Sequence, residues 1–211
     1  MSIVPVDWNV VVPGAWNIAI LTPEGIAKRL FQLESNKLVE IQVPLEQQAP
    51  IRVVYNDITV VPSNSRLVIA PNDPTPDGLD KAASICIQGI QSLPETPMNA
   101  AGINLRFKID SLPEELLELL TMSLDEKLSD ANYSIVGKVM KRSITWNEGI
   151  LNIEIHQSED ISGFLLFNFH RSSTKVEELT TWLSRSSGMI TLTKELLNSM
   201  FNLKLEGDDD E

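Results

Sequence analysis

The chain has 211 residues, of which 43% are hydrophobic and 22% charged, a composition typical of a globular protein and unlike that of a disordered one. It carries 29 acidic and 17 basic residues, which gives a net charge of −12, and its last four residues are all acidic. Without those four the body still has a charge of about −8 and would repel phosphate backbones. We therefore expect no nucleic-acid partner.

The single cysteine, Cys86, excludes an intramolecular disulfide, and its place between two isoleucines of a predicted helix favours a buried thiol. Residues 1–12 lack the basic stretch of a signal peptide. No apolar run approaches the roughly 20 residues of a membrane span. We therefore expect a cytoplasmic protein with no membrane partner.

The first half of the chain mixes strand and helix patterns. Residues 4–12 and 16–21 are rich in β-branched and apolar side chains on either side of Pro13-Gly14, which predicts a hairpin. Thr22 is a typical N-cap followed by proline, and predicts a helix that ends near residue 35. Further strands are predicted over residues 37–45, 51–55, 58–61, 66–70 and 100–109, with a helix over residues 79–93.

One of these strands has a regular alternation. In residues 37–45 the apolar positions Val39, Ile41, Val43 and Leu45 would share one face. Glu40 and Gln42 would share the other, as in a strand with one face in water.

The second half repeats the order of these periodicities without repeating the residues. Helices are predicted over residues 111–120, 123–130, 174–188 and 191–202, and strands over residues 133–146, 150–157 and 163–171. Gly149 is suited to a left-handed bulge position in the first turn, and Gly188 to the end of a helix. If the last two strands pair, the alternation places Ile155 opposite Leu165.

Meanders followed by helices predict an α+β fold with antiparallel sheets, not a doubly wound parallel sheet. We expect pseudo-repeated α-βββ-α blocks with two meanders of three to four strands each. The expected organisation is an N-terminal half over residues 1–110 (hairpin, helix, meander, helix, strand) and a C-terminal half over residues 111–205 (helices, meander, two helices). The two halves should either share an interface or form one continuous sheet. Residues 206–211 are expected to form a disordered acidic tail.

No pattern of catalytic, cofactor-binding or metal-ligating residues is evident. His156 and His170 should lie on the same face of the sheet but roughly 20 Å apart, too far to share a metal. Glu114 and Glu118 stand on one helix face and are better explained as a solvated acidic surface than as a metal site. The glycines form no phosphate cradle, and no Gly-x-Ser-x-Gly elbow is present. We expect no cofactor and no metal.

Two groups of residues are candidates for contact with another protein. Lys138, Lys141 and Arg142 share one predicted strand and could form a positive ridge with Arg171, although basic residues also protect the edge strands of sheets. Trp16 and Trp146 sit at strand ends beside turns, where tryptophan can anchor an interface or close off a core.

These patterns favour a non-catalytic protein that acts through protein–protein contact, with self-association as one form of that contact. The alternative is an enzyme or a small-molecule binder with a carboxylate-based site between the two halves. A flat apolar patch would favour the first hypothesis, and a deep cleft that holds several carboxylates of raised pKa the second.

Overall fold

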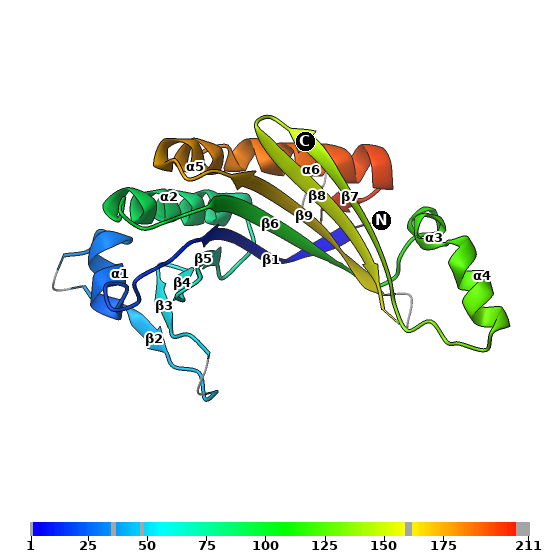
Figure 1. Cartoon of the computed structure of the whole chain (residues 1–211), viewed down its shortest axis with the longest axis horizontal. Coiled ribbons are helices and arrows are strands. Elements are labelled where there is room, and N and C mark those ends of the chain that lie inside the picture. Colours follow the sequence, from blue (N-terminus) through cyan, green and yellow to red (C-terminus); the bar gives the residue numbers. More distant parts are fainter. Residues whose placement is uncertain (1, 35–36, 47–48, 159–161, 206–211) are drawn as a thin grey trace.

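The computed structural model describes residues 2–34, 37–46, 49–158 and 162–205, and within them ten strands form a single sheet (Figure 1). The expected acidic tail, residues 206–211, lies outside the described residues. The strands in chain order are β1 (Ser2–Pro13), β2 (Glu40–Gln42), β3 (Arg52–Tyr55), β4 (Ile58–Pro62), β5 (Arg66–Pro71), β6 (Ala100–Ile109), β7 (Lys138–Trp146), β8 (Gly149–Gln157), β9 (Gly163–Ser172) and β10 (Lys204–Leu205).

The strand order across the sheet is β2-β3-β4-β5-β1-β6-β9-β8-β7, so β2 and β7 are its two edges. All neighbours in this order are antiparallel, and the short β10 adds to β1 in parallel. The long central strands β1 and β6 therefore join the strands of the first half to the β7–β9 meander of the second.

Six helices are described. They are α1 (Pro23–Arg29), α2 (Pro76–Ser92), α3 (Glu114–Leu120), α4 (Ser123–Asp130), α5 (Val176–Leu183) and α6 (Ser186–Phe201). The hydroxyls of Thr22 and Thr75 cap α1 and α2 by accepting the amide N–H of the third residue beyond them.

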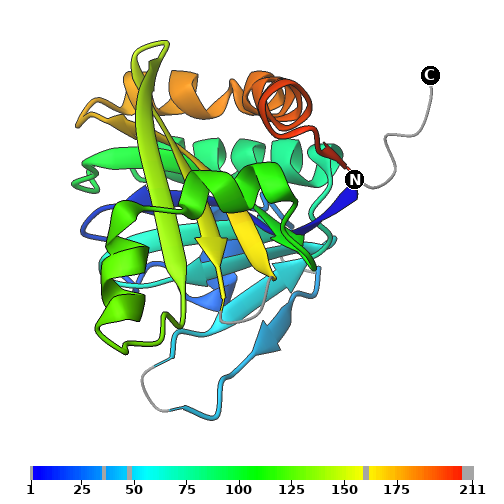
Figure 2. The same ribbon diagram turned by 90° about the vertical axis from the view of Figure 1, so that its right-hand side faces the viewer.

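Helices α2, α5 and α6 lie together on one face of the sheet, and the other face of the central strands carries no described helix (Figures 1 and 2). We call that second face the open face. The alternation in β6 explains the difference, because Ile103, Leu105 and Phe107 are buried towards the helices while Asn104 and Arg106 point to the open face.

The described apolar core is one continuous cluster that runs through both halves of the chain. Gly89 of α2 is part of it, since an added Cβ there would lie 3.1 Å from Cγ of Leu30, the residue that ends α1. The absence of a side chain at Gly89 therefore lets the end of α1 pack closely against α2.

The α+β class with antiparallel strands is confirmed, but the sheet is larger than predicted. The pseudo-repeat of two α-βββ-α blocks is not confirmed. The strands of both halves form one continuous sheet, which is one of the two arrangements that the sequence allowed. Residues 16–21 do not form the predicted hairpin strand but turn directly into α1.

The register of the last hairpin is confirmed. Ile155 pairs with Leu165, His156 with Phe164, and Ile150 with His170. The turn between β7 and β8 differs from the prediction, because Asn147 takes the left-handed conformation, with φ of 47°, in place of Gly149. Gly188 is also misassigned, since it lies in the first turn of α6 and does not end α5.

Candidate functional site

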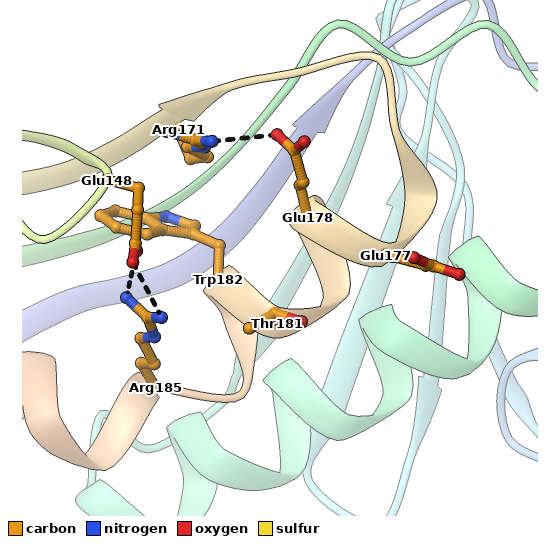
Figure 3. A pocket seen from close by; sticks show the side chains of 7 residues that line it. All are labelled: Glu148, Arg171, Glu177, Glu178, Thr181, Trp182 and Arg185. Atoms are coloured by element: carbon orange, nitrogen blue, oxygen red, sulfur yellow. Dashed lines mark hydrogen bonds and ion pairs between the residues drawn. The ribbon is translucent and has the colours of Figure 1, made fainter.

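A pocket of about 400 Å³ opens where the β7–β8 turn and the end of β9 meet α5 (Figure 3). Its lining is largely charged and consists of Glu148, Arg171, Glu177, Glu178, Thr181, Trp182 and Arg185. Glu148 comes from the turn, Arg171 from β9, and the others from α5 and the residues directly after it. All of them belong to the second half of the chain, so this is not a cleft between the two halves.

The indole of Trp182 forms the inner wall of the pocket and is only 2% exposed. It meets the ring of Trp146 edge to face at 5.3 Å between centroids, and Trp146 in turn meets Phe169 at 5.1 Å. The Nε1 of Trp182 is buried and has no hydrogen-bond partner among the described residues. Gly149 makes this packing possible, because a Cβ there would lie 2.5 Å from Cη2 of Trp182.

Four of the charged side chains that line the pocket form two ion pairs, Arg171 with Glu178 and Arg185 with Glu148. Glu178 accepts hydrogen bonds from Lys175 Nζ at 2.8 Å, from Ser173 Oγ at 2.9 Å and from Arg171 Nη2 at 2.9 Å. On the other side, Arg185 donates to both carboxylate oxygens of Glu148, at 2.5 and 3.5 Å.

These hydrogen bonds hold the carboxylates in their ionised form. The bonds from Lys175, Ser173 and Arg171 lower the pKa of Glu178 from its ordinary value near 4.5 to about 2. The hydrogen bond from Arg185 likewise lowers the pKa of Glu148. A general acid or base that works near neutral pH needs a pKa close to 7. These two carboxylates are therefore fixed anions and are unsuited to proton transfer.

A second arrangement, on the open face, is a ladder of side-chain amides that crosses five adjacent strands. Its members occupy directly opposed positions of β1, β6, β9, β8 and β7, and they are Asn9, Asn104, Asn168, Asn152 and Ser143. Each side chain donates to the one before it, at 2.6 to 2.8 Å, and Asn9 donates to Asp7. A shift of any strand by one residue would break this amide ladder, so it helps to fix the register of the sheet.

A parallel row on the same face contains one of the two histidines. His156 stacks on Phe164 at 4.0 Å between ring centroids, and its Nε2 is in hydrogen-bond contact with Glu154 at 2.9 Å. The guanidinium of Arg106 lies over the ring of Phe164, 4.9 Å from its centroid. His170 contacts Ser172 at 3.0 Å. The confirmed register keeps the two histidines at opposite ends of the β8–β9 hairpin. No cluster of three potential metal ligands occurs within the described residues.

The structure does not gather the basic residues into one ridge. Lys138 and Arg142 project to one face of β7 and Lys141 to the other, because residues alternate along a strand. Lys138 pairs with Asp125 at 2.6 Å and Lys141 with Glu154 at 2.7 Å, whereas Arg171 lies in the pocket. However, β7 is an edge strand, the position in which basic residues oppose pairing with another basic edge.

The two tryptophans proposed for contact are placed differently. Trp16 is 2% exposed and donates from Nε1 to the carbonyl of Val12 at 2.8 Å, so it belongs to the core. Trp146 is partly buried beside the pocket, between Phe169 and Trp182.

The sequence analysis missed an exposed apolar segment at the opposite edge of the sheet. We call residues 38–45 the β2 arm. Within it Leu38 is 90% exposed, Val43 71% and Leu45 fully exposed, and Ile41 in the strand is 48% exposed. Only Glu40–Gln42 are in strand conformation, which is shorter than predicted. Of the predicted apolar face, Val39 packs against the core, whereas Ile41, Val43 and Leu45 are exposed in the described structure.

No protein-family model matches the chain, and a search of curated proteins found no match. Within the described residues, no helix has the length and the apolar character that crossing a bilayer requires. The functional argument therefore depends on the geometry alone.

Proposed function

We propose that this protein acts through contact with another protein and not by catalysis, and that the β2 arm is the contact surface. The observation that carries the proposal is the exposure of Leu38, Ile41, Val43 and Leu45 along an unpaired edge of the sheet.

Two physical arguments support this. Contiguous exposed apolar side chains are uncommon on monomeric proteins and mark surfaces that become covered. An edge strand also presents backbone N–H and C=O groups to any strand that pairs with it, and natural proteins usually block such edges with charge or proline. The β2 arm contains one charge, Glu40, and one proline, Pro44, but Pro44 lies outside the strand Glu40–Gln42, whose central residue is the apolar Ile41.

A second candidate function is the binding of a small molecule in the pocket of Figure 3. It is favoured by the pocket volume, which lies within the range of ligand sites. A compound screen that monitors thermal stability would test it, because stabilisation of the wild type but not of Trp182→Phe would locate a ligand there.

The main proposal is tested with the variant Ile41→Lys/Val43→Lys, which places two cations on the β2 arm. The wild type and the variant are each immobilised, exposed to extract of the source cells, and the retained proteins are quantified. We expect a retained protein that the variant loses. Met200→Lys is the matched control, because Met200 is 65% exposed but lies on α6, away from the arm. Equal retention by the arm variant and the wild type would contradict the proposal.

A further inference from the structure

We propose that the β2 arm of one copy binds the outer edge of β7 of a second copy, so that the sheet continues head to tail from molecule to molecule. This inference rests on the proposed function and names the partner. It uses the two ends of the strand order, which are the two edges without a neighbouring strand in the described part of the chain.

The β7 edge is suited to receive the β2 arm. It is a strand of nine residues with an unpaired outer side, long enough to accept the whole arm. Its apolar side chains Val139 and Ile144 are 58% and 43% exposed. Tyr133 and Val136, which lead into the strand, are also exposed. Both edges therefore have apolar groups that pairing would remove from water.

The charges of the two edges are complementary. The charged residues of β7 are Lys138, Lys141 and Arg142. All three are basic, although the net charge of the chain is −12. The β2 arm contains one charged residue, Glu40, with Glu46 directly after it.

Internal ion pairs already occupy two of these cations. Lys138 and Lys141 are held by Asp125 and Glu154, whereas the Arg142 guanidinium donates only to the carbonyl of Lys141 among the described contacts. Glu40 accepts a hydrogen bond from Gln42 and makes no ion pair in the described part of the chain. Arg142 and Glu40 are thus the charges that remain for an intermolecular contact.

The same charges argue against symmetric pairing. Two β7 edges side by side would oppose basic strands to each other, and two β2 arms would bring together two segments in which Glu40 and Glu46 outnumber Lys37. Like charges across an interface are costly. A head-to-tail contact avoids this, and because its two surfaces differ, it forms rings or open chains and does not stop at a dimer.

The test is sedimentation velocity on the purified protein over a range of concentrations. We expect the wild type to form species larger than a dimer as concentration rises, and this association to weaken with added salt. Two double variants each repel one wild-type edge. Ile41→Lys/Val43→Lys places cations on the arm and repels the basic β7, and Arg142→Glu/Ile144→Glu places anions on β7 and repels Glu40 of the arm. Each should weaken association by at least about tenfold, whereas Met200→Lys leaves it unchanged.

An equimolar mixture of the two variants decides between head-to-tail and symmetric contact. In a head-to-tail arrangement the intact β7 of the arm variant meets the intact β2 arm of the β7 variant, so mixing restores one contact and gives a heterodimer that neither variant forms alone. In a symmetric arrangement one variant alone associates as the wild type does and mixing restores nothing, which would overturn the inference. If a double variant melts early, Val43→Lys and Arg142→Glu, both at exposed positions, replace it.

A wild type that stays monomeric at all concentrations would also overturn the inference. The proposed function would then still stand if the arm variant loses a protein retained from extract, and it would fail together with the inference if no such protein exists.

Discussion

Gly149→Ala should destabilise the fold, because the pocket wall is packed directly against this glycine. The new Cβ would lie 2.5 Å from Cη2 and 2.9 Å from Cζ3 of Trp182, and 2.6 Å from the carbonyl oxygen of His170. Carbon atoms in contact prefer separations of about 3.5–4.0 Å. The overlap is therefore about 1 Å, and it involves a buried indole and a backbone atom of the paired strand β9, neither of which can move away freely.

The magnitude follows from the cost of overpacking a close-packed site. Such substitutions typically cost about 1–3 kcal/mol, which for a chain of this length lowers Tm by roughly 2–12 °C. Gly188→Ala is the matched control. It lies in the first turn of α6 with no atom within 4 Å of the added Cβ, so it should raise stability by about 0.4–1 kcal/mol.

Urea unfolding followed by tryptophan fluorescence measures both variants. The reasoning predicts opposite signs for the same chemical change at the two sites. If Gly149→Ala unfolds at the wild-type urea concentration or above it, the close approach of Trp182 to the β7–β8 turn is wrong, and with it the pocket geometry.

Further predictions concern single groups and the chain end. The thiol of Cys86 is buried and its pKa is raised by desolvation, so a thiol reagent should label it only when denaturant is added. Glu178 has a depressed pKa, so its contribution to stability is complete above pH 4.5 and is lost as the pH falls towards 2. Acid melts of Glu178→Gln should lack that component, and an identical pH profile would contradict the hydrogen bonds from Lys175, Ser173 and Arg171. Asn104→Ala breaks the amide ladder in its middle and should lower the free energy of unfolding, measured in urea, by about 1–3 kcal/mol. Ser143→Ala, at the exposed end of the ladder, should lower it by less than about 0.5 kcal/mol. Deletion of residues 190–211 removes buried side chains of α6 and should prevent a cooperative melt, whereas deletion of residues 207–211 should leave Tm unchanged.

Local patterns in the sequence were sufficient for the β7–β9 meander. Apolar and polar residues alternate in β8 and β9, and one face must be buried, so only one register keeps Ile155 and Leu165 together. The same reasoning placed Cys86 in the core and Thr22 at the start of α1. Each of these features depends on residues close together in the chain.

Such local patterns could not predict the order of the strands in the sheet. That β1 lies between β5 and β6, and β6 between β1 and β9, is set by contacts between distant segments. The amide ladder could not be predicted for the same reason, because its residues are far apart in the sequence and become neighbours only when the sheet forms. In the β2 arm a local pattern was misleading, because its alternation predicts a buried face, whereas only Val39 packs against the core and Ile41, Val43 and Leu45 are exposed.

If the two edges of the sheet are contact surfaces, pairing protects the backbone amides along each of them. Hydrogen–deuterium exchange of the purified protein at low and high concentration measures this protection. We predict slower exchange at high concentration in residues 38–43 and 138–146, with the amides of the buried central strands unaffected. Exchange that is independent of concentration in both segments would contradict the head-to-tail account.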